Sequence, residues 1–283
     1  MTAGRPLLRW VQRIAAVLGV ALLLLWLVGP ILWIGLASIQ PEDAITVAPP
    51  QLTWHLNWHW YAFLITTPDW IHATWVSLQV SVLVTVCSIA IGGLAAYPLA
   101  RLEVPGRTGI MGLLIGTQMM PAIVIAIPIL LMFRFVHLTD TVAALVLVNT
   151  AFTVPLVVWL LYNFFEEVPR ALESAARIDG CSRLGALFRV TIPAAAPGIS
   201  ATAILILIGT WNEFLFAVIL GDRNAVTVTR RIAFLQSLPG AAGQPPYSEL
   251  AAAGILAVAP CILLVLLFHR KIIAGITEGF IKG

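Results

Sequence analysis

Charged side chains are scarce for a chain of this length. Only 10% of the 283 residues are Asp, Glu, Lys or Arg, whereas soluble domains carry about 25%. The 16 basic and 13 acidic side chains are too few to cover a globule that faces water. This composition excludes a cytosolic enzyme, a secreted disulfide scaffold and a disordered chain.

Several functional signatures are also missing. No basic run typical of nucleic-acid binding is present, and no glycine-rich loop ends in Gly-Lys-Ser/Thr, so the chain cannot bind and hydrolyse ATP alone. Cys87 and Cys261 lie in apolar runs and Cys181 in a polar loop, so we expect no structural disulfide. His55 and His59 have no third ligand nearby, and we expect no metal site.

Apolar residues, by contrast, are abundant. They make up 60% of the chain, and the mean hydropathy is +0.97. A membrane-spanning helix needs about 20 mainly apolar residues. Six runs reach this length: 14–39, 73–99, 109–133, 142–165, 197–220 and 249–269. We therefore predict an all-α polytopic membrane protein, with residues 1–283 as one transmembrane domain and a first run that is retained rather than cleaved.

The basic residues predict the orientation. With the N-terminus inside, twelve Lys and Arg fall on the inner side and four on the outer side. The four outer residues are Arg134, Arg223, Arg230 and Arg231. The segment 40–72 has no Lys or Arg and is rich in tryptophan, which suits an outer membrane interface. Both termini and loop 166–196 are therefore expected in the cytoplasm.

Loop 166–196 has the features of a short helix lying between two spans. Good helix formers run from Ala171 to about Leu187, and Glu173 and Arg177 are spaced to support one helical turn. From periodicity alone, this segment could be an amphipathic surface helix without special function. Its small residues would equally allow another protein's backbone to approach closely.

The residues of this loop also resemble a known motif. The sequence ESAARIDG at 173–180, followed by VTIP at 190–193, resembles the EAA loop of ABC importer permeases. The similarity is greatest to the maltose-type carbohydrate permeases, in particular their MalG-like subunit. Ser174 stands where that motif has its glutamate, so a salt bridge from this position to an ATPase is not expected.

Three further segments extend the resemblance over nearly the whole chain. QMMP at 118–121 with IP at 127–128 resembles the third span of that subfamily, and WNEFL at 211–215 resembles its fifth. The ending, from AGIT at 274–277 to Lys282 and Gly283, resembles its C-terminal tail. Four motifs in order on six predicted spans make the resemblance specific.

The resemblance implies a non-catalytic permease subunit in the bacterial inner membrane that imports a disaccharide or oligosaccharide. The implied partners are a second, MalF-like permease, a cytoplasmic ATPase dimer that binds ATP and Mg, and an extracytoplasmic sugar-binding protein. No cofactor is expected in this chain. The implied ATPase-coupling residues are Glu173, Ser174, Ala175, Ala176, Asp179 and Gly180.

A second set of polar residues could line the solute pathway. These candidates are Gln118, Asn149, Trp211, Asn212 and Glu213. An unpaired polar group at membrane depth costs several kcal/mol. The polar members of this set could therefore form hydrogen bonds between helices instead, and the Trp211 ring could serve packing.

Other functions remain open at this level. A related permease could carry a polyamine, a phosphonate or a polyol, and an ATP-independent carrier or channel would need no ATPase. A membrane-embedded enzyme would need a convergent catalytic set, which the sequence does not offer.

Overall fold

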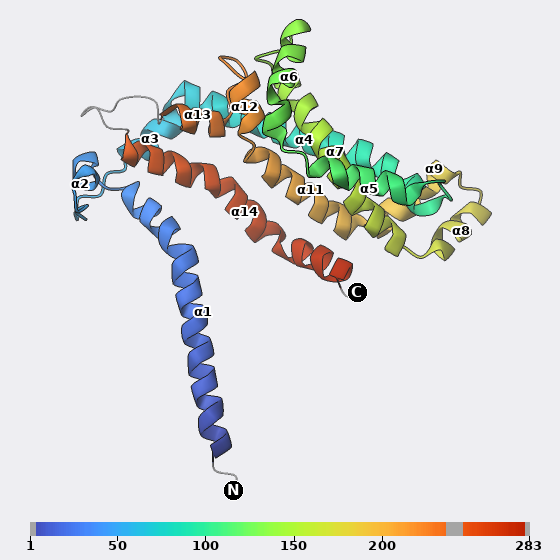
Figure 1. The fold of residues 1–283 in the computed structure, drawn as a ribbon, viewed down its shortest axis with the longest axis horizontal. Coiled ribbons are helices and arrows are strands. Elements are labelled where there is room, and N and C mark those ends of the chain that lie inside the picture. The colour runs from blue at the N-terminus through green and yellow to red at the C-terminus, as the bar shows by residue number, and fades with distance from the viewer. Residues whose placement is uncertain (1–3, 236–245, 281–283) are drawn as a thin grey trace. The chain divides into compact units, whose positions relative to one another are not determined.

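The computed structural model describes residues 4–235 and 246–280, and every regular element in them is a helix (Figure 1). This confirms the all-α prediction. The helices are α1 (Gly4–Ala37), α2 (Glu42–Thr46), α3 (His59–Thr66), α4 (Pro68–Arg101), α5 (Arg107–Gln118), α6 (Ala122–Phe135), α7 (Val142–Glu167), α8 (Arg170–Ile178), α9 (Arg183–Ala186), the π-helix η1 (Leu187–Thr191), α10 (Ile192–Ala194), α11 (Ala196–Trp211), α12 (Leu215–Leu220), α13 (Val228–Leu235) and α14 (Tyr247–Phe280). Lys282 and Gly283 of the predicted tail motif lie outside the described residues.

Four helices are long and apolar enough to cross a membrane: most of α1, all of α4 and α7, and residues 247–269 of α14. Two bent helix pairs bring the number to as many as six within the described residues. Four of the six predicted runs therefore lie in continuous helices, whereas the third and fifth runs are interrupted.

The third run, 109–133, is not the uninterrupted helix that we expected. It divides into α5 and α6, which meet at an angle of 87°. Pro121 precedes α6 and has no N–H to continue the helical ladder, and it also disfavours a helical backbone at Met120. The span therefore bends where the ladder is interrupted.

The fifth run, 197–220, is also divided. Helix α11 ends at Trp211, and α12 begins only at Leu215. Upstream, the segment Arg183–Ala194 meets α11 at 78°, with Ala195 between them. The predicted run is thus divided between α11 and α12 and does not form one helix.

One compact unit comprises residues 1–67 and 234–258. None of the apolar window in α1 is buried, so its leucines are available to lipid or to another chain. Glu42 caps the start of α14: its two carboxylate oxygens accept from Tyr247 N at 2.7 Å and Ser248 N at 2.8 Å. His55 precedes α3 while His59 begins it, so the two imidazoles do not share one helix.

The second unit comprises residues 68–233 and 259–283 and holds most of the core. Helices α4 and α7 pack along each other, and α11 packs against both (Figure 1). Gly92 permits the close approach of α4 to α7, because a Cβ there would lie 2.5 Å from Val157 Cγ1. The hydroxyls of Ser88 and Thr153 bond across the same interface at 2.6 Å. This helix pair forms the frame on which the functional segments are placed.

Candidate functional sites

The loop that follows α7 is built around a glycine turn. Helix α8 begins after Pro169 and ends at Ile178, which is earlier than the predicted helix end near Leu187. Gly180 has φ +89°, a conformation that residues with a Cβ rarely adopt. Gly180 N donates to Arg177 O at 3.1 Å and Cys181 N to Ala176 O at 2.9 Å. These two bonds form a Schellman motif, which explains why the helix stops there.

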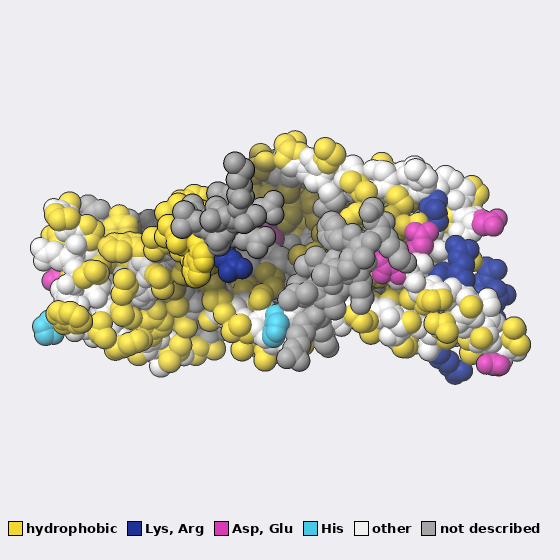
Figure 2. All heavy atoms as spheres, turned by 90° about the horizontal axis from the view of Figure 1, so that it is seen from below, with side chains coloured by type: hydrophobic (Ala, Val, Ile, Leu, Met, Phe, Trp, Pro, Cys, Tyr) yellow, Lys and Arg dark blue, Asp and Glu magenta, His cyan; other side chains and the backbone are white. Residues whose placement is uncertain are grey.

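The chain then continues through α9, η1 and α10 to the start of α11. Ser182 caps α9, since its hydroxyl accepts from Gly185 N at 3.1 Å. Three large apolar side chains on this loop face outward: Ile178 is 86% exposed, Leu184 60% and Phe188 59%. Figure 2 shows Lys and Arg side chains gathered at the same end of the unit, where α8 and α9 lie. The loop therefore presents an apolar surface among basic groups.

The six predicted coupling residues do not all face the same way. Ser174, Ala175, Asp179 and Gly180 are exposed, and Ala176 is half-buried. Glu173 points into its own chain, where only 12% of its side chain is accessible. Its carboxylate pairs with Arg101 of α4, whose Nε lies 2.8 Å from Glu173 Oε1. Sequence reasoning missed Arg101, whose position at the end of an apolar run gave no sign of its partner.

A cavity of about 390 Å³ opens between α5, α6, α7, α11 and α12. It brings together three of the five predicted pathway residues, Gln118, Asn149 and Glu213. Thr153 and Thr210 add hydroxyl groups to its wall. Trp211 and Asn212 do not line it. Trp211 is buried, and the Asn212 amide bonds to Ile208 O at 2.8 Å and contacts Cys261 Sγ at 3.5 Å.

The polar groups of this cavity are partly used within the chain. Gln118 Nε2 donates to Phe152 O at 2.9 Å, and Asn149 Nδ2 to Leu145 O at 2.9 Å. Thr210 Oγ1, although buried, has no hydrogen-bond partner among the described residues. The cavity therefore combines amides already fixed in position with a hydroxyl still able to bond.

Glu213 has a structural task beside the cavity. Its carboxylate accepts from Phe216 N at 2.7 Å and from Ala217 N at 3.1 Å. These bonds satisfy the first N–H groups of α12, which has no preceding helical turn to serve them. The acid in the WNEFL segment thus stabilises the restart of the fifth span.

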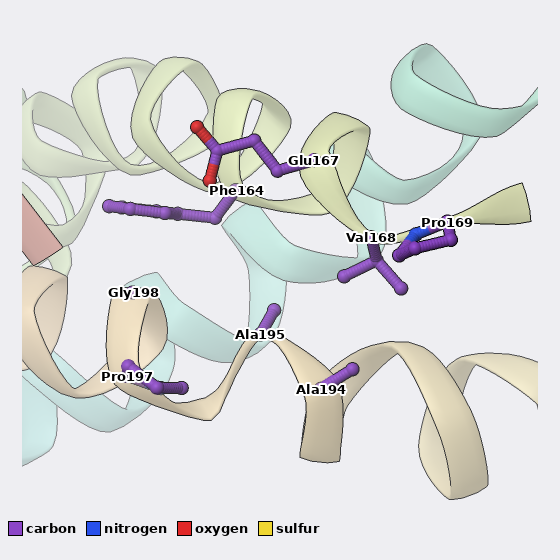
Figure 3. Close-up of a pocket in the computed structure, with 8 residues that line it drawn as sticks. All are labelled: Phe164, Glu167, Val168, Pro169, Ala194, Ala195, Pro197 and Gly198. Atoms are coloured by element: carbon purple, nitrogen blue, oxygen red, sulfur yellow. The ribbon is translucent and has the colours of Figure 1, made fainter. Parts of the chain in front are cut away.

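A smaller hollow, of about 230 Å³, lies where α7 ends and α11 begins. Figure 3 shows the Phe164 ring above Gly198, with Val168 and Pro169 along the wall. A Cβ at Gly198 would lie 2.3 Å from Phe164 Cγ. The absence of a side chain at Gly198 therefore allows α11 to pack under this ring.

Asp140, between α6 and α7, is a second residue that sequence reasoning missed. Its carboxylate accepts hydrogen bonds from the backbone of the loop after α12, at Asp222, Arg223, Asn224 and Ala225. Burial raises the pKa of the Asp140 carboxyl, but these backbone N–H groups outweigh it and lower the pKa from 3.8 to about 2. Its backbone has φ +59°, and no sequence pattern indicated this role.

Residues 88–278 match the family described as the inner membrane component of binding-protein-dependent transport systems. The chain belongs to this family. It is accordingly a non-catalytic permease subunit of an ABC importer, a multi-pass protein of the inner membrane without a cofactor of its own.

Named relatives extend over nearly its full length. The trehalose transport permease SugB of Mycobacterium tuberculosis is 32% identical, over 97% of this chain and 97% of the relative. The trehalose/maltose permease MalG of Thermococcus litoralis is 31% identical, over 96% of this chain and 98% of the relative. The sulfoquinovosyl glycerol permease SmoH of Agrobacterium fabrum is 32% identical, over 90% of this chain and 88% of the relative. The resemblance to sugar permeases, MalG included, is confirmed.

Solved structures share the fold. A chain of a bacterial ABC transporter that imports the acidic polysaccharide alginate matches with a TM-score of 0.78, covering 93% of this chain and 96% of that one, at 21% identity. A chain of the methionine transporter MetNI matches with a TM-score of 0.56 over 72% of this chain and 95% of that one, at 18% identity. The described helices therefore follow the permease fold of ABC importers.

Proposed function

We propose that this chain forms half of a membrane pathway for a disaccharide or oligosaccharide and pairs with a second, MalF-like permease. The cavity that holds Gln118, Asn149 and Glu213 carries this proposal. Amide and hydroxyl groups can bond to sugar hydroxyls. The Phe152 and Phe216 rings, whose centroids lie 4.9 Å apart, offer apolar surface for the C–H groups of a sugar. The names of the relatives, which mention trehalose, maltose and a glycosyl glycerol, support a sugar as the solute.

Loop 166–196 is proposed to lie in the cytoplasm with both termini and to dock on an ATPase dimer that binds ATP and Mg. Exposed Ser174, Ala175 and Asp179, together with Gly180 at the turn, would form the docking surface. Ile178, Leu184 and Phe188 would add apolar contact area, because large exposed apolar groups commonly mark interaction sites. Closure of the ATPase would then move α8 and, through it, the spans.

The opposite side of the membrane is proposed to receive an extracytoplasmic sugar-binding protein. The loops that follow α6 and α12 would lie there. The binding protein would release its sugar towards the cavity when the spans open outward.

Purification from the native host in mild detergent, followed by mass spectrometry, tests the assembly. We expect stoichiometric recovery of an ATPase, a second permease and a binding protein. Proteoliposomes of this complex should take up labelled trehalose or maltose only with ATP and the binding protein. Uptake by the chain alone without ATP would contradict the proposal and indicate a carrier or channel.

Two variants then separate the sites. Gly180→Asp should abolish ATPase assembly or uncouple ATP hydrolysis from uptake. Thr210→Val, which removes the unpaired hydroxyl from the cavity, should reduce uptake while assembly stays intact. Competition by a polyamine, a phosphonate or a polyol in place of sugars would overturn the substrate assignment and leave the importer assignment intact.

A further inference from the structure

One carboxylate joins four segments at the end of α4. Glu173 Oε1 accepts from Arg101 Nε at 2.8 Å and from the Thr191 hydroxyl of η1. Its other oxygen, Oε2, lies 3.4 Å from the Tyr97 hydroxyl, which also lies 3.1 Å from Arg183 O. Helix α8 is thereby bonded to α4 and η1, and the Tyr97 hydroxyl extends the contact to the start of α9.

Arg101 of α4 bonds to two places along the segment that contains α8. Besides pairing with Glu173, its Nη2 donates to Val168 O at 2.8 Å, in the link between α7 and α8. Only 3% of its side chain is accessible. A planar guanidinium can hold two acceptors at fixed angles, which the single ammonium group of lysine cannot do. Arg101 therefore fixes both the start and the middle of the loop helix against α4.

The adjacent residues of α8 face the other way. Ser174, Ala175, Arg177 and Ile178 are exposed. The Glu173 carboxylate, by contrast, points inward and bonds to Arg101, Thr191 and Tyr97. The helix thus has one side bonded to its own protein and another side left for a partner.

We propose that Glu173 is a positioning residue that fastens α8 to the end of α4 through Arg101, and that it does not contact the ATPase. This inference rests on the proposed coupling role of loop 166–196 and divides that loop into two parts. The exposed residues bind the ATPase, and the Glu173–Arg101 pair transmits the movement of the helix to the spans. Without the pair, a docked helix would move without carrying α4 with it.

The first test needs no partner protein. The three native cysteines are replaced, and a nitroxide spin label is attached at Arg177→Cys in the purified permease. Glu173→Gln and Arg101→Lys should each increase label mobility. Glu166→Gln is the matched control, because its pair with Arg107 spans 3.6 Å and is exposed. Unchanged mobility in both test variants, or an equal increase in the control, would overturn the proposal.

The second test uses the reconstituted importer. Glu173→Gln should still co-purify with the ATPase in wild-type stoichiometry, while the amount of sugar transported per ATP hydrolysed falls well below the wild-type value. Loss of the ATPase from Glu173→Gln but not from Arg101→Lys would mean that Glu173 is an ATPase contact and would overturn the proposal.

A double variant provides the remaining check. Because the Glu173–Arg101 contact is lost only once, the combined effect of Glu173→Gln and Arg101→Lys should be smaller than the product of the two single effects. If the effects of the two single substitutions multiply fully in the double variant, the proposal is overturned. Absence of ATP-dependent uptake in the wild-type complex would instead contradict the proposed function, whereas the spin-label result would still report on the Glu173–Arg101 pair.

Discussion

The Asp140 carboxylate holds Asn224 by both its main chain and its side chain. Asn224 N lies 2.9 Å from Asp140 Oδ1 and 3.0 Å from Oδ2, and Asn224 Nδ2 lies 2.9 Å from Oδ2. The backbone N–H of Asp140 in turn donates to Leu220 O at 2.7 Å, at the end of α12. The connection between α6 and α7 is thereby fastened to the end of the interrupted fifth span.

Asp140→Asn should destabilise the protein at neutral pH. Hydrogen bonds to a charged group contribute about 1.5–3 kcal/mol, roughly twice the contribution of a neutral bond. The variant keeps one acceptor oxygen but loses the charge, so we expect a loss of about 1–2 kcal/mol. Thermal unfolding in detergent at pH 7 measures it. Asp222→Asn, which changes an exposed acid in the loop that Asp140 binds, is the control and should unfold near the wild-type temperature.

The same bonds predict an acid-sensitive contribution to stability. The pKa of Asp140 is lowered from 3.8 to about 2, so its contribution is fully present well above pH 4. It is lost as the pH falls towards 2, where the folded state also becomes protonated. The difference in unfolding temperature between wild type and Asp140→Asn should therefore shrink between pH 5 and pH 2. A constant difference over that range would contradict the assignment.

Gly198→Ala should disturb the packing of α11 on α7. The added Cβ would lie 2.3 Å from Phe164 Cγ, and overpacking of this kind costs about 1–3 kcal/mol. Gly209→Ala, on the same helix with open space at its Cβ position, should not be destabilised by crowding. The unfolding temperatures of both variants measure the difference. If both temperatures fall by the same amount, crowding against Phe164 is not the cause.

Gly180 allows a graded test of the glycine turn. Alanine at φ +89° is strained by about 1–2 kcal/mol, although nothing lies within 4 Å of its Cβ. Asparagine tolerates left-handed backbone better. We expect ATPase recovery to decrease from wild type to Gly180→Asn to Gly180→Ala, as measured by quantitative co-purification. If alanine and asparagine behave alike, backbone conformation is not the limiting property.

Glu213 requires two substitutions for a clear result. Glu213→Ala leaves the Phe216 and Ala217 N–H groups without their acceptors, which costs about 1–3 kcal/mol. Glu213→Gln retains one acceptor oxygen and should be more stable. Comparing uptake at equal amounts of folded protein separates the helix cap from a role towards the solute. A pathway role requires that uptake fall in the better-folded glutamine variant as well.

The sequence predicts the spans well and the breaks in them poorly. Hydropathy measures the apolar length of a segment, and all six runs reappear in the helices. The bend between Gln118 and Ala122 depends on how Pro121 is accommodated in space, which hydropathy does not report. A single proline is compatible with a continuous helix in α7, which contains Pro155, so its presence alone does not locate a bend.

The candidate sites show a similar division. Membrane depth and polarity led to Gln118, Asn149 and Glu213, which the structure places at one cavity, and their role towards the solute stays a prediction. The inward orientation of Glu173 could not be predicted, because periodicity assigns residues to a helix face without saying what that face contacts. Its partner Arg101 is 72 residues away in sequence, and nothing local links the two.

The cap on α14 has a consequence for the order in which the chain is assembled. Glu42 accepts from Tyr247 N and Ser248 N across 205 and 206 positions of sequence, and it lies outside the matched family region, 88–278. During synthesis, the segment carrying Glu42 emerges long before the helix that it caps. A chain shortened to the family region would leave these two N–H groups without their acceptor, so the beginning of α14 depends on a segment made long before it.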